Sequence, residues 1–428
     1  MEPASSASRN PWANSPCRPG ADAATLALED FDPSNPDLFA TAAWEPFFAR
    51  LRAEAPVHYC RTAPFGPYWS VTRFRDIQYV DSQHALFSSE PTIVLADPPE
   101  DFLLQPGFIA MDPPRHEAYR LAVQPVVAPP NLGRLEPLVR TRVAAILDAL
   151  PVGEDFDWVQ QVSIELTTQM LATLFDIPWE DRHKLARWSD VATAGPPQAG
   201  RVDMRDAAWR ASMLECLDYF QALWKERATR APGERLDFLG LLARDPATRQ
   251  MSAMELLGTL ILLIVGGNDT TRNSISGGVV ALEENPGEYL KLRADPALVG
   301  SMVPEIIRWQ TPLAYMRRTA VQDTELGGQR IRAGDKVVMW YLSGNRDESE
   351  IPDAHRFIVD RPNARHHLGF GVGIHRCMGN RLAEMQLRIA WEEILQRFAR
   401  IEVCGTPERV MSCFVHGFER LPVRVYPR

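Results

Sequence analysis

The chain has 428 residues, of which 45% are hydrophobic and 24% are charged, and it carries a formal net charge of −9. This composition is ordinary for a globular protein, and the negative charge argues against binding nucleic acid or anionic lipid over the whole surface. The six cysteines form no CxxC pair and no Cys/His spacing typical of a zinc site. Their low density also argues against a disulfide-stabilised scaffold.

The N-terminal region has no apolar run of the kind found in secretory signals, since Ser, Ala, Pro and Asn dominate residues 1–22. We expect these residues to form a disordered tail. The longest apolar run, 256–265, is too short to span a bilayer. The sequence therefore predicts no transmembrane segment and a cytoplasmic location.

Helical periodicity begins at residues 44–55 and is followed by two predicted strands, 57–59 and 68–71, around a Pro/Gly turn. Helical patterns then dominate as far as residue 310. The predicted helices in this part are 135–149, 163–175, 206–227, 237–243, 252–284 and 299–310.

A second strand-forming region follows, with predicted strands at 318–324, 329–332 and 335–341. A coil then leads to a predicted helix at 378–400, and short strands are expected over 402–426. There is no internal repeat and no alternating βαβ pattern. The predicted class is therefore mainly α, with a small β part in an α+β layout.

One cysteine, Cys377, lies in the glycine-rich stretch FGVGIHRCMG, residues 370–379, directly before a predicted helix. Cationic neighbours and the free N–H groups at a helix start both stabilise a thiolate. Gly371 and Gly373 allow the backbone to turn tightly and to approach a flat group. A buried structural cysteine is the ordinary alternative, but these neighbours favour a metal ligand, with Phe370 packing on the cofactor.

This stretch resembles the haem-binding signature of the cytochrome P450 family, Phe-x-x-Gly-x-x-x-Cys-x-Gly, with Phe370, Gly373, Cys377 and Gly379 in the fixed positions. The resemblance implies that Cys377 is the thiolate ligand of the iron in haem b. It also implies the family's fold, a triangular, mainly helical prism with a small β-rich region. Residues 23–428 are then expected to form a single catalytic domain.

The stretch GGNDTT, beginning at Gly266, lies inside the predicted helix 252–284. Two glycines within a helix cost about 1 kcal/mol each relative to Ala, and close approach to a flat ligand would offset that cost. The hydroxyl of Thr270 can bond the Gly266 carbonyl one turn earlier. A helix crossing at small residues, with a solvated Asp269, is the alternative. The stretch resembles the family's oxygen-activation motif, which implies that Thr270 assists oxygen activation and that Asp269 relays protons from water.

Two cations, His116 and Arg120, are spaced i, i+4 on a helix expected to begin after Asp112. Charge-assisted bonds from such a pair suit the two carboxylates of a haem, although an exposed amphipathic face is the alternative. The pair resembles the family's propionate-binding helix, and Arg318 and His375 occupy two further positions that bind propionate in relatives.

Glu305 and Arg308 are spaced i, i+3 on a predicted helix and can pair on one face. Most pairs with this spacing are surface pairs that contribute little to stability. The Glu-x-x-Arg pattern resembles the family's buried structural pair, whose third member is an arginine before the cysteine loop. Arg356 is expected to be that member, with Arg361 as the alternative.

The substrate cavity should be lined by apolar residues from several segments, so its substrate should be apolar. Each candidate residue could equally be an ordinary member of the hydrophobic core that does not contact the substrate. The candidates are Ile93, Leu95, Leu262, Val265, Gly266, Leu313, Ala314, Met316, Phe414 and Val415.

The residues after the oxygen motif and around Cys377 resemble the soluble bacterial subfamily that hydroxylates linear alkanes and fatty acids at the terminal carbon. This implies O₂-dependent terminal (omega) hydroxylation of medium-chain n-alkanes, alcohols or fatty acids in a narrow channel that presents only the chain end. Hydroxylation of terpenes or steroids is the alternative. A peroxide-using enzyme is disfavoured by the Asp269–Thr270 pair, and a haem or ligand sensor is disfavoured because no sensor partner domain is recognisable.

The family's bacterial members take electrons from separate proteins. We expect a small [2Fe–2S] ferredoxin and its NAD(P)H-dependent reductase. Small ferredoxins are usually acidic, so Arg115, Arg376 and Arg381 are expected to form a basic docking face.

Overall fold

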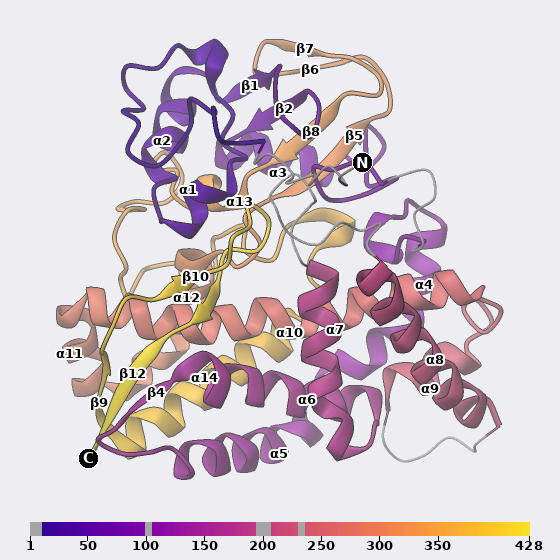
Figure 1. Ribbon diagram of the computed structural model, residues 1–428, viewed down its shortest axis with the longest axis vertical. Coiled ribbons are helices and arrows are strands. Elements are labelled where there is room, and N and C mark those ends of the chain that lie inside the picture. Colours follow the sequence, from indigo (N-terminus) through magenta and orange to yellow (C-terminus); the bar gives the residue numbers. More distant parts are fainter. Residues whose placement is uncertain (1–10, 99–104, 194–206, 230–235) are drawn as a thin grey trace, which may run out of the picture.

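The computed structural model describes residues 11–98, 105–193, 207–229 and 236–428. It confirms the predicted class, because helices form most of the molecule and the strands form small sheets. Figure 1 shows a helical body crossed by one long helix, with the N-terminal residues and most of the first sheet gathered on one side of it.

The long helix is α10 (Ala253–Glu284), which confirms the predicted helix at 252–284. It begins at a capping box, in which the Ser252 side chain accepts from the N–H of Glu255 and the Glu255 side chain accepts from the N–H of Ser252. By length and composition alone α10 is apolar enough to cross a membrane. It is nevertheless a core helix, since several helices pack around it. These are α6 (Glu165–Phe175), α7 (Arg182–Thr193), α8 (Ala207–Thr229), α12 (Val299–Gln310) and α14 (Asn380–Arg397).

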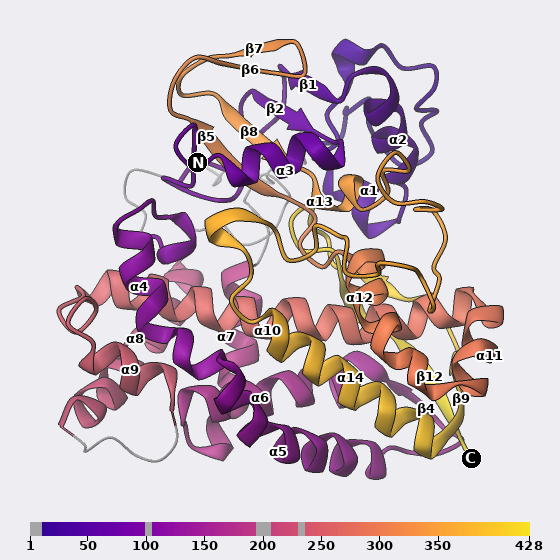
Figure 2. The same cartoon turned by 180° about the vertical axis from the view of Figure 1, so that it is seen from behind.

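The other helices cover the two ends of this body and the β-rich part (Figure 2). In the described residues they are α1 (Pro36–Ala40), α2 (Glu45–Glu54), α3 (Phe74–Ser82), α4 (Arg115–Val123), α5 (Pro129–Asp148), α9 (Phe238–Arg244), α11 (Pro286–Ala294) and α13 (Tyr341–Gly344). The predictions at 44–55, 237–243 and 299–310 are confirmed within two residues at each end. Residue 206, the predicted start of α8, lies outside the described residues.

Five of the described helices had no counterpart among the predicted helices: α1, α3, α7, α11 and α13. Helix α11 buries only Leu292, and the buried face of α7 consists of Leu185, Ala186, Trp188 and Ser189. Short helices with so few apolar positions give a weak periodic signal, and tertiary packing rather than propensity stabilises them.

The main sheet has the strand order β1-β2-β8-β5-β3. The predicted strands at 57–59 and 68–71 are confirmed as an antiparallel pair, with His58 opposite Ser70, and β2 pairs in parallel with β8 through Trp69 and Val337. The predicted strand at 318–324 begins two residues earlier, at Met316. The strands are β1 (Val57–Cys60), β2 (Tyr68–Val71), β3 (Phe87–Ser88), β5 (Met316–Ala320) and β8 (Lys336–Met339).

Three smaller sheets complete the described β structure. A hairpin turns at Gly327 and Gly328, both with positive φ, and the C-terminal strands pair beside the helical body. The hairpin is β6 (Thr324–Leu326) with β7 (Gln329–Ile331); the C-terminal sheets are β4 (Asp155–Asp157), β12 (Pro422–Pro427) and β9 (Phe398–Val403), and β10 (Glu408–Arg409) with β11 (Phe418–Arg420).

The N-terminal segment differs from the expected disordered tail. Residues 1–10 lie outside the described residues, but Trp12 and Cys17 are 3% and 0% exposed. Both belong to a hydrophobic cluster with α2 and the turn between β1 and β2. A composition rich in Ser, Pro and Asn suggests disorder only when apolar residues are too few to pack, and one tryptophan and one cysteine are sufficient here.

Candidate active site

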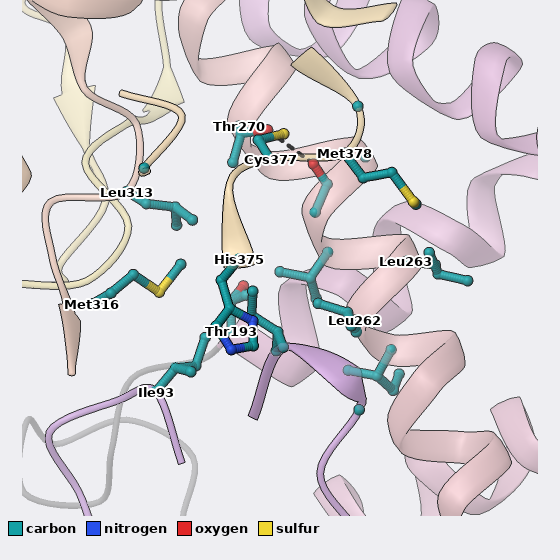
Figure 3. Close-up of a pocket in the computed structure, with 18 of the residues that line it drawn as sticks. Ile93, Thr193, Leu262, Leu263, Thr270, Leu313, Met316, His375, Cys377 and Met378 are labelled. Carbon is teal, nitrogen blue, oxygen red and sulfur yellow. Dashed lines mark hydrogen bonds between the residues drawn. The ribbon is translucent and has the colours of Figure 1, made fainter. Parts of the chain in front are cut away.

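A cavity of about 660 Å³ lies between α10 and the β-rich part, and Cys377 is part of its wall. Figure 3 shows Thr270 and Cys377 together at one end of the drawn pocket, with Leu262 on one side and Leu313 and Met316 on the other. Most of the expected pocket residues line this cavity: Ile93, Leu262, Val265, Gly266, Leu313, Met316 and Phe414.

Three of the expected pocket residues do not line it. Leu95, Ala314 and Val415 are at most 2% exposed and lie outside the cavity wall. Ala314 donates its N–H to the carbonyl of Phe414 at 2.9 Å, and Leu313 bridges to Val415. In such extended segments neighbouring side chains point to opposite sides, so residues next to lining positions belong to the core.

The Cys377 loop is held in shape by its backbone. The N–H of Cys377 donates to the carbonyl of Phe370 at 2.8 Å, and Gly371 and Gly373 have φ of 63° and 66°, a region that favours glycine. A Cβ on Gly373 would lie 2.4 Å from the carbonyl oxygen of Asp81. The loop therefore requires glycine at 373 because it passes directly against the C-terminal end of α3.

The thiol of Cys377 faces the cavity just before α14 begins at Asn380. Burial in this cavity raises the pKa of the thiol, while the N–H of Gly379 and the cations Arg120 and Arg376 act to lower it. Cys377 is exposed on the cavity wall, where a metal can reach its thiol, and the neighbouring donors stabilise the charge of a metal-bound thiolate.

Thr270 and Gly266 form the predicted contact on α10. The Thr270 hydroxyl donates to the Gly266 carbonyl at 2.9 Å, and both residues line the cavity. A Cβ on Gly266 would meet nothing within 4 Å, whereas a Cβ on Gly267 would lie 2.7 Å from Leu171 of α6. The two glycines thus serve different purposes, since Gly266 leaves room in the cavity and Gly267 allows two helices to pack closely.

Asp269, the expected proton relay, does not lie at the cavity wall. It is 0% exposed, and its Oδ1 accepts from Ser189 and from Asn268, each at 3.1 Å. Arg272 lies 3.1 Å from the same oxygen and 2.7 Å from Asp190, whose side chain is 52% exposed. The Oδ2 atom of Asp269 has no hydrogen-bond partner in the described part of the chain. Asp269 is therefore linked toward solvent by an ion-pair chain.

The four residues expected to bind the haem propionates gather near Cys377. Arg120, Arg318 and His375 line the cavity, and the rings of His116 and His375 lie 4.2 Å apart. Arg120 donates to the carbonyl of Arg376 at 2.6 Å. Burial, together with the charge of Arg318, lowers the pKa of His375 to about 2. The pKa of His116 is lowered by burial and by Arg120, so both rings are neutral and each carries one N–H.

The ring nitrogens of His116 and His375 are buried and have no partner among the described residues. An unpaired buried donor is costly, so these rings and the adjacent guanidinium groups fit a ligand that carries carboxylates. The residues present therefore fit a haem with its propionates, and the thiol of Cys377 on the cavity wall fits its iron.

Asp81 is a functional neighbour that sequence reasoning missed. Its buried carboxylate accepts from Arg318 at 2.7 Å, from the Tyr341 hydroxyl at 2.9 Å and from the N–H of Val372 at 2.9 Å. It thus connects an expected propionate residue to the cysteine loop. No local signal marks it, because its partners lie more than two hundred residues away in sequence.

The Glu-x-x-Arg pair is fully buried, as the resemblance implied. Glu305 and Arg308 are both 0% exposed and 2.7 Å apart. The third member is Arg361, whose Nε lies 2.9 Å from Glu305, and not Arg356, whose side chain is 67% exposed. The prediction for Arg356 is wrong because that residue contributes its carbonyl, which accepts from Arg308 and Arg361 at 2.9 and 2.7 Å, while its side chain points to solvent.

Comparison with known proteins agrees with this geometry. A family model described as Cytochrome P450 matches residues 215–411. Linalool 8-monooxygenase of Pseudomonas putida is 38% identical over 94% of this chain and 100% of its own. Methyl-branched lipid omega-hydroxylase of Mycobacterium tuberculosis is 32% identical over 88% of this chain and 90% of its own. The solved structure of cytochrome P450-153 from Novosphingobium aromaticivorans covers 92% of this chain and 99% of its own, at 44% identity with a TM-score of 0.85. The chain therefore belongs to the cytochrome P450 family of haem-dependent monooxygenases.

Proposed function

We propose that this monooxygenase hydroxylates the terminal carbon of a linear, apolar substrate, namely a medium-chain n-alkane or fatty acid. The observation that carries the proposal is the cavity. Apolar side chains such as Ile93, Leu262, Leu313 and Met316 line it, and Cys377 and Thr270 lie together at one end. A chain that enters end-on then reaches the reactive end with its last carbon, and this positioning favours terminal attack.

Each site residue has a proposed role. Cys377 ligates the haem iron as thiolate, and Arg120, Arg318, His116 and His375 bind the propionates. The bound haem supplies activation of O₂ and insertion of one oxygen atom into a C–H bond.

Thr270 and Asp269, consecutive residues of α10, have different proposed roles in proton delivery. The Thr270 hydroxyl holds a proton at the cavity wall, where it is positioned by its bond to Gly266. Asp269 supplies the replacement proton, and Ser189, Asn268 and Arg272 hold its carboxylate in position.

The names of the relatives agree with different substrate classes. One is named for the omega-hydroxylation of methyl-branched lipids, which is attack at a chain end. Another is named for the 8-hydroxylation of linalool, a monoterpene alcohol. The second name keeps hydroxylation of terpenes, or of steroids, as the alternative function.

Bacterial enzymes of this class depend on redox partners. We propose a [2Fe–2S] ferredoxin with an NAD(P)H-dependent reductase, acting in the cytoplasm on residues 23–428 as one catalytic domain. Arg376 and Arg381 are exposed on the loop and helix that follow His375. Arg115, the third expected docking residue, is instead paired with Glu255. Arg381→Glu should therefore lower the rate of turnover driven by ferredoxin. As the control, the variant and wild type should be reduced at the same rate by a chemical reductant.

The substrate class is tested by a spin-state titration of the purified ferric protein with octane, dodecanoic acid, a monoterpene and a steroid. A low- to high-spin shift with the linear ligands only supports terminal hydroxylation, and gas chromatography of the product must then show the 1-alcohol or the omega-hydroxy acid. A shift with the polycyclic or branched ligands only would refute the linear-chain proposal in favour of the alternative.

The role of Cys377 is tested separately with Cys377→Ser. The variant should still fold, but its reduced carbon monoxide complex should lose the absorption band typical of thiolate ligation. Persistence of that band would place the ligand elsewhere. Cys413→Ser is the matched control, because Cys413 also lines the cavity and should leave the band unchanged.

A further inference from the structure

The described N-terminal segment, residues 11–35, is held against the molecule by specific contacts. Asn35 donates its amide to the carbonyl of Cys17 at 2.8 Å, and the N–H of Asp32 donates to the Cys17 sulfur at 3.3 Å. The guanidinium of Arg50 donates to the carbonyls of Ala23 and Leu26 at 2.6 and 2.5 Å. These contacts give the segment a defined path over α2 and the β1–β2 turn.

This path brings Trp12 against Phe65. Their ring centroids are 5.7 Å apart, and the two side chains are 3% and 7% exposed. Phe65 lies in the turn between β1 and β2, and it also lines the main cavity. Trp12 itself does not line the cavity, so its contact with Phe65 forms a second layer behind the wall.

The backbone of Phe65 is fixed independently of Trp12. Its carbonyl accepts from the Lys336 ammonium at 2.7 Å, and Lys336 pairs with Asp97 at 2.6 Å. With the backbone fixed, the position of the Phe65 ring depends on what packs behind it. In the described part of the chain, the ring contact behind it is Trp12.

The cavity therefore lies between two hydrophobic cores. Residues of α10, such as Leu262, belong to or pack on the large helical core. Phe65, Tyr315 and Cys413 belong to the cluster that also contains Trp12. The N-terminal segment is thus continuous, through this cluster, with the wall opposite α10.

We infer that Trp12 is a positioning residue for substrate length, because it holds the Phe65 ring in the cavity wall and so sets how long a chain the cavity accepts. The inference deepens the proposed function and rests on it for the identity of the substrate. Removing the indole leaves space into which the Phe65 ring can withdraw. The cavity then accommodates additional methylenes, each of which changes binding roughly tenfold when it fits or fails to fit an apolar pocket.

The test uses the full-length, haem-loaded protein and two ligand series. One is n-octane, n-decane and n-dodecane, followed by spin state. The other is 1-butyl-, 1-octyl- and 1-dodecylimidazole, whose imidazole coordinates haem iron whatever the native substrate. The variants are Trp12→Ala, Phe65→Ala and the double variant. The matched control is Trp44→Ala, since Trp44 is a buried tryptophan of the same cluster that packs on Phe48 and His416 instead.

In Trp12→Ala and Phe65→Ala the ratio of long-chain to short-chain affinity should rise about threefold or more in both series. The double variant should show no larger rise than Phe65→Ala alone, because Trp12 acts through that ring. Trp44→Ala should lower thermal stability by a similar amount and leave the ratio unchanged. An unchanged ratio in Trp12→Ala, or an equal change in Trp44→Ala, would overturn the inference.

The two proposals fail in distinguishable ways. If wild type shows no spin shift with any n-alkane or with dodecanoic acid, the proposed function fails. The alkylimidazole series still measures the cavity length in that case, so a selective change in Trp12→Ala would support the role of Trp12, and no change would reject it.

Discussion

Asp269 and Thr270 are consecutive residues of α10, yet their side chains lie in different environments. The Thr270 hydroxyl faces the cavity and bonds the Gly266 carbonyl at 2.9 Å. The Asp269 carboxylate is fully buried and pairs with Arg272 at 3.1 Å. The helix thus separates the Thr270 hydroxyl, at the reaction site, from the Asp269 carboxylate, which is connected to solvent. Substitution of each residue should therefore have a different effect on activity.

Thr270→Ala should retain haem and substrate binding but divert electrons into hydrogen peroxide, because the hydroxyl that holds a proton at the cavity is lost. Peroxide formed per NAD(P)H consumed should rise several-fold, while the spin-state dissociation constant stays within about twofold. Thr270→Ser, which retains the hydroxyl, is the control and should remain largely coupled. Full coupling in Thr270→Ala would exclude the proposed role.

Arg361→Gln should lower the free energy of unfolding by about 3 kcal/mol, because it leaves Glu305 short of one buried partner. Arg361 is 5% exposed and lies 2.9 Å from that carboxylate. Arg356→Gln is the matched control, since its side chain is 67% exposed, and it should change stability by less than about 0.5 kcal/mol. Urea unfolding of both variants measures the difference. Equal effects would mean that the carbonyl contacts of the loop, and not the Arg361 charge, stabilise this region.

The sequence was informative wherever a function needs a fixed local spacing. The Cys377 stretch, the Gly266–Thr270 contact and the Glu305–Arg308 pair each lie within one loop or one helix turn, so residue identity and spacing are sufficient to predict them. The class of fold and the long helix α10 followed from periodicity over many residues.

Long-range relationships were not predictable in this way. The choice between Arg356 and Arg361 depends on the path of a loop, which turns one side chain inward and the other outward. Asp81 meets Arg318 only through the tertiary fold. Few apolar residues lie near Trp12 in the sequence, and its burial depends on contact with a turn more than fifty residues later. Each of these outcomes is set by packing partners that no local pattern specifies.

Acid should destabilise the protein through His416. Burial, with the charge of Arg409, lowers the pKa of this histidine to about 3, while an unfolded chain has a histidine pKa of about 6.5. Between these values the unfolded state binds more protons, so stability is fully present above about pH 6.5 and falls by about 1.4 kcal/mol per pH unit below it.

The test of this contribution is His416→Asn. The Nδ1 of His416 donates to the carbonyl of Gln310 at 2.5 Å, and an asparagine amide supplies a donor that does not titrate. Between pH 7 and pH 5 the variant should lose about 2 kcal/mol less stability than wild type in urea unfolding. An identical loss in both proteins would assign the acid sensitivity to other groups.

Two glycines of α10 should respond oppositely to alanine. A Cβ on Gly258 would lie 1.8 Å from the carbonyl oxygen of Gln105, whereas a Cβ on Gly266 would meet nothing within 4 Å. Gly258→Ala should therefore cost about 2 kcal/mol or more through overpacking against a backbone atom. Gly266→Ala should raise the stability of the haem-free chain by up to about 1 kcal/mol, because alanine is the better helix former.

The two variants should also differ in haem and ligand binding, in the opposite order to their stability. The methyl group of Gly266→Ala projects into the cavity that holds Cys377 and Thr270, so haem incorporation or ligand affinity should fall although the chain is more stable. Gly258→Ala should bind haem normally in the fraction that folds, since Gly258 packs on residues 105–107 and precedes Gly266 by about two turns of α10. Unfolding of the haem-free chains, together with haem titration of each, separates the two effects. If Gly266→Ala binds haem and ligand as wild type does, then the space that this glycine leaves in the cavity is not required for binding either of them.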